Sequence, residues 1–184
     1  MTAASHHCRS ARGCNKLMYY ETLVETPYGP LHLTADDEAL IEAKFLDETS
    51  VTNIKRDGSL AAPLCIAVDW YKRYFDGERP DPTEVPIRIE GTPFQKEVWS
   101  IVREIPYGEV LSYGEIARVI AARRGIPRMA AQAVGGAMKA NHIFILIPCH
   151  RVIGADGSMV GYGTREDSLQ LKRALLRHEG ILWT

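Results

Sequence analysis

The sequence predicts an α/β N-terminal domain, a small antiparallel sheet plus one helix, followed by a mainly α-helical C-terminal domain with a helix-turn-helix. Residues 19–46 alternate apolar and polar side chains on both sides of a turn at Pro27 to Pro30, as antiparallel strands do. From Thr92 onward, apolar side chains recur at helical spacing between Gly and Pro breaks. The Pro-rich residues 80–86 separate the patterns, so we expect a flexible tail at 1–17 and domains at 18–90 and 91–184.

The N-terminal domain begins with three expected strands, at residues 20–25, 31–35 and 39–46. An amphipathic helix is predicted over 60–76, because Leu64, Val68, Tyr71 and Phe75 recur at three- and four-residue spacing and Gly77 suits its end. A short extended piece at 85–89 completes this domain.

The C-terminal domain opens with Thr92 and Pro93, a helix-start signal, and the predicted helix runs to Ile105. Two further helices, at 112–122 and 128–140, resemble a helix-turn-helix with a long connection. The apolar run 143–147 predicts a buried strand that ends at Pro148. A last helix over 166–179 places these residues on one face: Leu169, Lys172, Leu175, Leu176 and Glu179.

The helix at 128–140 has one apolar face and one nearly bare face. At 100° per residue, Ala130, Ala133, Val134 and Ala137 share the first face, and the second carries Gln132, Gly135 and Gly136. A glycine inside a helix costs about 1 kcal/mol relative to alanine, so two in a row indicate the close approach of another backbone. A nucleic acid and a neighbouring helix both fit.

Composition and charge restrict the class of protein. The chain has 184 residues, of which 46% are apolar and 24% charged, without a run of roughly 20 apolar residues or a signal-peptide pattern. We therefore expect a cytoplasmic protein, or a nuclear one in a eukaryote, with reduced cysteines and no membrane contact. Residues 112–139 carry five basic side chains and one acid, which suits a phosphate backbone or a solvated helical face.

Cys149 is the candidate nucleophile, because a thiolate forms most readily beside cationic or basic neighbours such as His150 and Arg151. Neighbouring side chains on an extended segment point to opposite faces, so His150 is expected to reach the sulfur through a water or at a bend made by Pro148. Glu179 could orient the imidazole, which gives a Cys, water, His, Glu relay. A buried, inert cysteine and a Cys-His hydrolase are the alternatives.

Six ordered segments of the chain resemble the O6-alkylguanine-DNA alkyltransferases, also called methylated-DNA–protein-cysteine methyltransferases. These are GTPFQ at 91–95, IPYGE at 105–109, SYGEIA at 112–117, AVGGA at 133–137, IPCHRV at 147–152 and LLRHE at 175–179. The resemblance covers roughly residues 19–182.

This resemblance implies direct DNA repair in which Cys149 takes the alkyl group from O6-alkylguanine and is used once. His150 would be the water-linked base, Glu179 its partner, and Asn141 the residue that organises the turn near the thiolate. Tyr113 would donate a proton to the leaving guanine. No metal or organic cofactor is expected, since the displacement needs none and the spacing of His6, His7, Cys8 and Cys14 suits zinc poorly.

The implied partner is double-stranded DNA, bound from the minor groove by a monomer that flips the damaged base outward. The alkylguanine pocket would comprise Met138, Pro148, Val152, Tyr162 and Gly163. The DNA interface would comprise Tyr113, Arg123, Arg124, Arg128, Ala131, Gln132, Gly135, Gly136 and Arg151, the last chiefly as a structural and electrostatic support.

The chain departs from the family pattern at three places. Gln132 stands where the family usually carries an arginine that fills the space of the flipped base. His142 and Phe144 replace frequent prolines, and the loop at 163–168 is about three residues longer than usual. Two alternatives therefore stay open: an alkyltransferase-like protein that binds lesions without repair, which Cys149 opposes, and a helix-turn-helix transcription regulator, for which the bare helix face offers few base-reading side chains.

Overall fold

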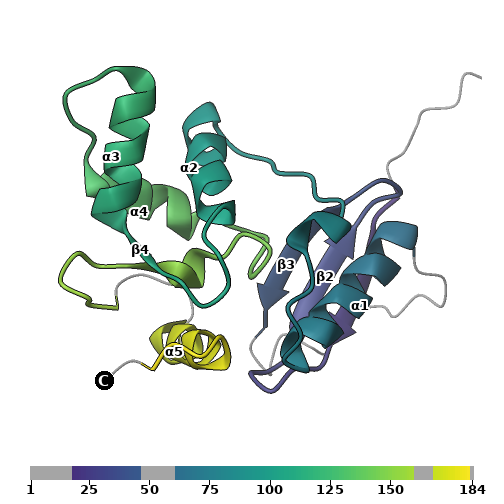
Figure 1. Ribbon diagram of the computed structural model, residues 1–184. Helices are drawn as coiled ribbons and strands as arrows, with labels where there is room; N and C mark the ends of the chain where they lie inside the picture. The colour runs from purple at the N-terminus through teal and green to yellow at the C-terminus, as the bar shows by residue number, and fades with distance from the viewer. Residues whose placement is uncertain (1–17, 47–60, 160–167, 183–184) are drawn as a thin grey trace, which may run out of the picture.

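The computed structural model describes residues 18–46, 61–159 and 168–182, which form two lobes joined by an extended segment (Figure 1). The N-terminal lobe is an antiparallel sheet of β1 (Tyr20–Val24), β2 (Leu31–Ala35) and β3 (Leu40–Phe45), in the order β1-β2-β3. Helix α1 (Ala62–Phe75) packs on one face of this sheet (Figure 1). The predicted fold class of this lobe is confirmed.

Alternation along the strands determines which face of the sheet is covered. Leu31 and Leu33 of β2 are fully buried, and their cross-strand partners on β3 are Phe45 and Ala43. Val24 of β1, opposite Leu31, is also buried. Removing such apolar side chains from water stabilises the lobe by roughly 1.5–3 kcal/mol for each large one.

Helix α1 lies within the range predicted for it, 60–76, and buries part of the predicted face. Its last turn is followed by Gly77 at a φ of 89°, a left-handed conformation that glycine adopts without strain. Its sheet-facing side buries Leu64, Ala67, Tyr71 and Tyr74, whereas Val68 is only partly covered. Two of these residues bond to the C-terminal lobe: Tyr71 donates its hydroxyl to Phe144 O, and Tyr74 donates its hydroxyl to Glu179.

The segment between the lobes is extended, as predicted for 85–89. It starts with a short 3-10 turn, η2 (Pro82–Glu84), capped by the Asp81 carboxylate. Ile87 then pairs in parallel with Leu40 of β3, through Leu40 N–H to Pro86 O at 2.8 Å and Arg88 N–H to Leu40 O at 2.9 Å. The connection thus lies along the sheet edge.

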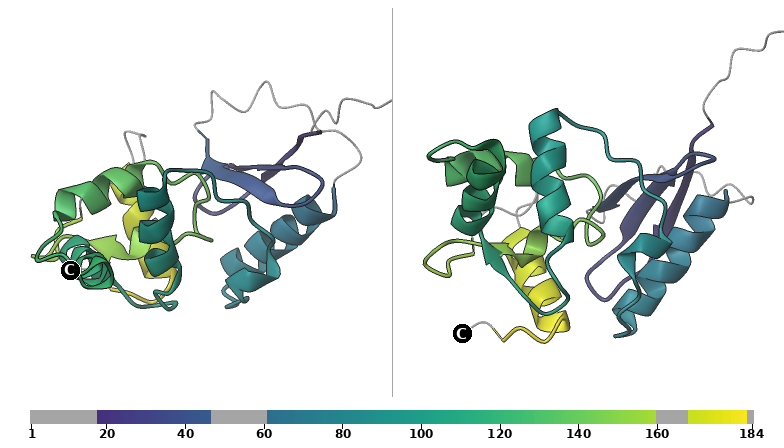
Figure 2. Two further views of the ribbon diagram at one scale, coloured as in Figure 1. Left: turned by 90° about the horizontal axis from the view of Figure 1, so that it is seen from above. Right: turned by 45° about the horizontal axis from the view of Figure 1, so that its top comes forward.

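The C-terminal lobe is mainly helical, as predicted. Its elements are α2 (Pro93–Arg103), β4 (Leu111–Ser112), α3 (Tyr113–Arg124), α4 (Ala131–Lys139), η3 (Cys149–Arg151), β5 (Val152–Ile153) and α5 (Ser168–His178). Capping boxes fix the starts of α2, by Thr92 and Gln95, and of α3, by Ser112 and Glu115. Helices α2, α3 and α4 pack against one another, and α5 lies below them (Figure 2).

The strand predicted over 143–147 is wrong. The segment makes only isolated bridges, Ala43 with Ile143 and Phe144 with Ile147, and it turns at Ile145, which has a φ of 74°. Ile143 and Ile147 are nevertheless fully buried. A continuous apolar run predicts burial but not backbone shape, and here the buried segment is a loop.

The last helix begins at Ser168 and turns most of the predicted face inward, with one exception. Leu169 is 39% exposed, whereas Leu171 is buried, so Leu169 was assigned to the wrong face. Lys172, Leu175 and Leu176 are fully buried, and Glu179, just past the helix, is 4% exposed. None of the helices in the described ranges is long and apolar enough to span a bilayer.

Candidate active site and nucleic-acid interface

The sulfur of Cys149 lies in a buried, hydrogen-bonded position at the start of η3. The residue is 3% exposed. The side-chain amide of Asn141 donates to Cys149 Sγ at 3.0 Å and to Ile147 O at 3.0 Å, while its oxygen accepts from Ile143 N–H at 3.0 Å. Asn141 therefore holds the loop in shape and directs a donor at the sulfur. A hydrogen bond to sulfur favours the thiolate over the thiol.

Because Cys149 is on a 3-10 turn, the extended backbone from which we predicted the direction of His150 is absent. His150 is fully buried, and its Nε2 lies 2.8 Å from Glu179 Oε1. The structure thus brings together the imidazole and the carboxylate that were predicted to meet.

Glu179 accepts hydrogen bonds from four residues. Besides His150, Arg151 donates from Nε to Oε2 and from Nη2 to Oε1, both at 2.8 Å, and Tyr74 donates its hydroxyl to Oε1 at 2.7 Å. The Gly108 N–H reaches Oε2 at 3.3 Å. This set accounts for a carboxylate 4% exposed to solvent.

The protonation states follow from burial and from these contacts. Burial acts to raise the pKa of Glu179, but the hydrogen bonds and charges of His150 and Arg151 outweigh it and hold this pKa far below its usual range. Burial lowers the pKa of His150, with Glu179 opposing. The carboxylate is therefore ionised and the imidazole neutral at pH 7. An ionised carboxylate only accepts, so Nε2 carries the proton and Nδ1 is the basic ring nitrogen.

Lys172 is a functional candidate that the sequence analysis did not assign. It is fully buried on α5, its Nζ donates to Val152 O, and the ammonium lies 5.8 Å from the centre of the Tyr113 ring. Burial lowers the pKa of Lys172 to about 8, although attraction to Cys149 acts against this shift. A lysine on the apolar face of an amphipathic helix was the signal in the sequence.

Tyr113 is the first residue of α3 and is 8% exposed. Burial, and then the charge of Cys149, raise the pKa of Tyr113 to about 12. Its phenol therefore stays protonated at neutral pH and is able to donate a proton or a hydrogen bond.

An open groove of about 640 Å³ runs over α4 beside Tyr113. It is lined by Tyr113, Gly114, Ala131, Gln132, Gly135, Gly136, Lys139, Gly154 and Ala155. A methyl group built on Gly136 has no neighbour within 4 Å, and one on Gly135 meets only the Tyr113 ring, at 4.0 Å. No neighbouring helix among the described residues therefore requires these glycines, which leaves close approach by an external partner.

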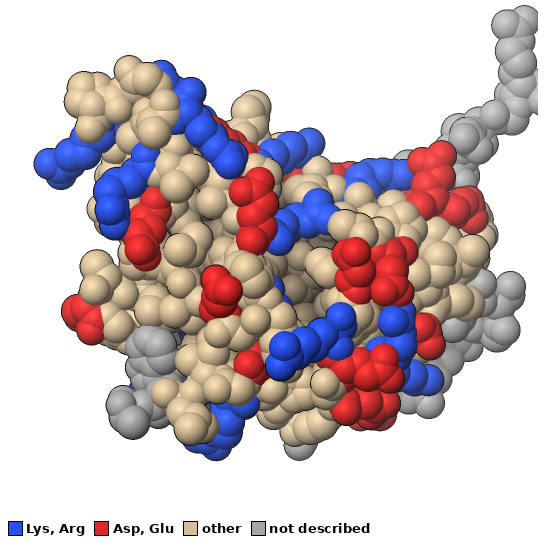
Figure 3. Space-filling model, viewed as in Figure 1, with Lys and Arg blue, Asp and Glu red and all other residues tan. Residues whose placement is uncertain are grey.

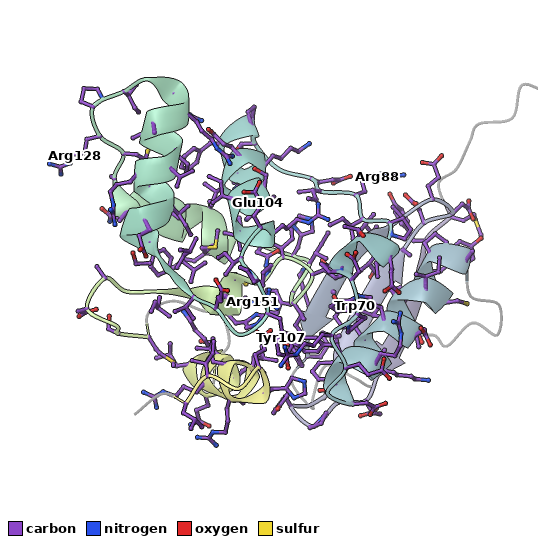
Figure 4. The ribbon with its side chains drawn as sticks, viewed as in Figure 1. Trp70, Arg88, Glu104, Tyr107, Arg128 and Arg151 are labelled. Carbon is purple, nitrogen blue, oxygen red and sulfur yellow. The ribbon has the colours of Figure 1, made fainter. Side chains whose placement is uncertain are left out.

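The basic residues predicted to contact DNA differ in their surroundings: some project outward and others are paired with acidic side chains. Lys and Arg side chains gather over α3 and its connection to α4 (Figure 3), and Arg128 projects outward from that connection (Figure 4). Arg124 pairs with Glu97 of α2 at 2.5 Å, and Arg123 lies 3.6 Å from Glu104. The α4 helix starts at Ala131, not at Arg128 as predicted.

Arg151 does not lie on an exposed DNA-facing surface. Its side chain is 11% exposed, and besides Glu179 it donates from Nη1 to Ile105 O at 2.7 Å. A buried guanidinium must be paired, and this one is paired with Glu179; contact of Arg151 with DNA stays a prediction. The structural and electrostatic support that we expected agrees with these contacts.

The predicted pocket residues are buried as far as the structure describes them. Pro148, Met138 and Val152 are buried, while Tyr162 and Gly163, like the loop at 163–167, lie outside the described residues. Within the described ranges, no three side chains of His, Cys, Asp or Glu are grouped so that they could hold a metal ion.

Comparisons with known proteins identify the family of the chain. The model of the 6-O-methylguanine DNA methyltransferase DNA binding domain matches residues 93–181, and that of its ribonuclease-like domain matches residues 18–89. The chain is 38% identical over 163 residues to a protein from Haemophilus influenzae named methylated-DNA–protein-cysteine methyltransferase, covering 88% of this chain and 87% of that one.

Two solved structures from Mycobacterium tuberculosis are also similar. The crystal structure of its O6-methylguanine methyltransferase superposes with a TM-score of 0.72 at 39% identity, covering 88% of this chain and 93% of that one. The structure of the same kind of protein in complex with DNA gives 0.70 at 41% identity, covering 88% and 91%. On these matches along both lobes, the chain belongs to the 6-O-methylguanine DNA methyltransferase family.

Proposed function

We propose that this protein repairs DNA by moving the alkyl group of O6-alkylguanine to Sγ of Cys149, once per molecule. One observation carries the proposal: Asn141 donates to Cys149 Sγ at 3.0 Å beside a buried His150 whose Nε2 is held by Glu179 at 2.8 Å. Relatives named methylated-DNA–protein-cysteine methyltransferase, similar over most of the chain, support it.

The chemistry is a single displacement. Nδ1 of His150 accepts the thiol proton through a water, and Glu179 stabilises the imidazolium that forms. The thiolate attacks the alkyl carbon, the carbon–oxygen bond breaks, and its electron pair remains on guanine, which Tyr113 protonates. The thioether that results is stable to water, so no step restores the thiol. The reaction is that of a methylated-DNA–protein-cysteine methyltransferase with a single turnover, and it needs no cofactor.

The groove over α4 is the proposed docking site for duplex DNA. Because Gly135 and Gly136 carry no side chains, a phosphate–sugar backbone can approach this face of α4 closely. Lys139 lines the groove and Arg128 projects from the connection that precedes α4, both suited to phosphates. Gln132 would enter the minor groove and occupy part of the space of the flipped base.

Three further expectations complete this proposal. The protein acts as a monomer on one lesion, in the cytoplasm or, in a eukaryote, in the nucleus. Residues 18–90 and 91–184 are its two domains. The lesion pocket is formed by Met138, Pro148, Val152, Tyr162 and Gly163.

The experiment that tests the proposal counts turnovers. Duplex DNA carrying one O6-methylguanine is supplied in tenfold excess, and restored guanine is measured until the reaction stops. We expect a plateau at one guanine per protein and none with Cys149→Ala. If restored guanine instead keeps rising beyond the protein concentration, the protein is a hydrolase. If no guanine is restored, the proposed repair is contradicted.

A second function, lesion binding without repair, is favoured by one observation. Gln132 lacks the charge and length of the usual arginine, so base extrusion is the weakest step of the proposed mechanism. The two functions differ in the same assay. Tight binding of the O6-methylguanine duplex with no loss of methyl over hours would support the lesion-binding alternative.

A further inference from the structure

We propose that Tyr74, which α1 contributes from the N-terminal lobe, is a positioning residue for alkyl transfer. Its hydroxyl donates to Glu179 Oε1, the same oxygen that His150 Nε2 contacts. This inference rests on the proposed function and adds to it a role for the N-terminal lobe at the reacting sulfur.

The hydrogen bond is short, buried and between distant parts of the chain. Tyr74 OH lies 2.7 Å from Glu179 Oε1, although 105 residues separate them, and the tyrosine is 1% exposed. Its ring stacks on Trp70 at 5.6 Å, and its carbonyl lies 2.8 Å from His178 Nε2. The phenol therefore has little freedom to turn away from the carboxylate.

Tyr74 remains a donor at the pH of the reaction. Burial, and then the neighbouring charge of Glu179, raise the pKa of Tyr74 well above its usual value. Each donor to Oε1 takes up part of the negative charge of that oxygen. Without the Tyr74 hydroxyl, more of the negative charge of Glu179 Oε1 acts on His150. The pKa of His150 then rises, because the imidazolium form is stabilised relative to the neutral base.

The other charged and titratable groups around His150 and Glu179 come from η3, from α5 and from the connection after α2. Arg151 comes from η3 and Lys172 from α5, and both lower the pKa of His150. Tyr107, from the connection after α2, donates to His178 O at 3.0 Å instead of to the carboxylate. Figure 4 places Arg151 and Tyr107 at the junction of the lobes, near Trp70 of α1. Among the described residues, Tyr74 provides the hydrogen bond to Glu179 from the N-terminal lobe.

The test compares Tyr74→Phe with Tyr71→Phe. Tyr71 is a matched control on the same helix, since it is fully buried and its hydroxyl donates at 2.7 Å, but to the backbone oxygen of Phe144. The rate constant for transfer from an O6-methylguanine duplex is measured from pH 5 to pH 9. We expect Tyr74→Phe to lower this rate constant about tenfold, as losing one hydrogen bond to a charged group would. We also expect the acid limb of the profile, where the rate constant falls as His150 is protonated, to move to higher pH.

Tyr71→Phe should leave the midpoint of that limb where it is in the unsubstituted protein. Partial unfolding lowers the amplitude of the reaction, or scales the rate constant by the folded fraction, so the position of the acid limb is the deciding readout. A Tyr74→Phe profile that superimposes on the unsubstituted one, or a shift of equal size in Tyr71→Phe, would overturn the inference.

Failure of the proposed function would look different. If the unsubstituted protein takes no methyl group from DNA, the same pH profiles are recorded for carbamidomethylation of Cys149 by iodoacetamide, followed by the mass of its peptide. A shift of the acid limb confined to Tyr74→Phe would support the positioning role even then, and superimposable profiles would refute it.

Discussion

Cys149 is a buried thiol whose polar neighbours come from separate stretches of chain. Asn141 directs its amide at the sulfur, Lys172 provides a nearby cation from α5, and Glu179 holds His150 from beyond the end of that helix. The first two contacts favour negative charge on the sulfur, and the third orients the imidazole that accepts its proton. The reactivity of this cysteine therefore depends on tertiary packing as much as on its neighbours in sequence.

Lys172→Met is expected to change how stability depends on pH. The pKa of Lys172 is about 8 in the folded protein and 10.5 ordinarily. Between these values the unfolded chain binds more protons, so the free energy of unfolding rises with pH there, by up to about 3 kcal/mol. Lys172→Met should remove that rise and slow alkyl transfer. Urea unfolding at pH 7.5 and 10.5 tests it, with exposed Lys139→Met as control; identical pH dependence in all three proteins would contradict the expectation.

Gln132→Arg is expected to speed repair of duplex DNA. Gln132 is exposed on α4 and lines the groove, and an arginine there would add length and charge for the space of the flipped base. The rate constants with a duplex and with free O6-methylguanine base are compared, since only the duplex requires extrusion. Equal effects on the two substrates would refute this role for Gln132.

At the scale of elements, residue spacing predicted the helices and missed one loop. Capping signals at Thr92 and Ser112 and apolar spacing gave α2, α3 and α1 to within a few residues, because these signals are local. The loop at 143–147 was mistaken for a strand, because its shape depends on Asn141 and on bridges to β3, which lie outside the run itself.

The bare face of α4 leads to a prediction for Gly136→Ala. Since a methyl group there meets nothing within 4 Å, the substitution should stabilise the free protein by about 1 kcal/mol through helix propensity. It should also weaken binding of duplex DNA, whose backbone would meet the added methyl group. Urea unfolding and DNA titration check the two effects, and reaction with free O6-methylguanine base is the control. Unchanged duplex affinity would show that DNA does not approach this position.

At the scale of the whole molecule, the two lobes share one buried polar network. Tyr74 of α1 reaches Glu179, and Ala43 of β3 bonds to the loop before Cys149, through its N–H to His142 O at 2.8 Å. The sequence predicted that His150 and Glu179 meet, since Glu179 lies on an inward helix face. Asn141 was expected near the thiolate only through the family resemblance, and Tyr74 was not expected at all, because nothing in a single sequence reports which distant side chains meet.

This network predicts how acid affects stability. Folding lowers the pKa of Glu179. Its contribution to the free energy of unfolding is therefore present above the ordinary pKa of a glutamate and is lost as the pH falls below that value. Glu179→Gln should cost about 3–5 kcal/mol at pH 7, since it leaves Arg151 buried without its counter-charge, and should flatten the acid limb of the stability curve. Glu84→Gln, at an exposed ion pair with Arg73, is the control and should change little. Equal losses in both variants would contradict the account.

The role of Cys149 as alkyl acceptor is tested by the mass of the peptide that contains it, after reaction with duplex DNA carrying O6-methylguanine. The account predicts a gain of one methyl group on that peptide and none on the peptide with Cys65, although Cys65 is exposed and Cys149 is buried. A methyl group on one of the other three cysteines with none on Cys149, or on no cysteine at all, would contradict it.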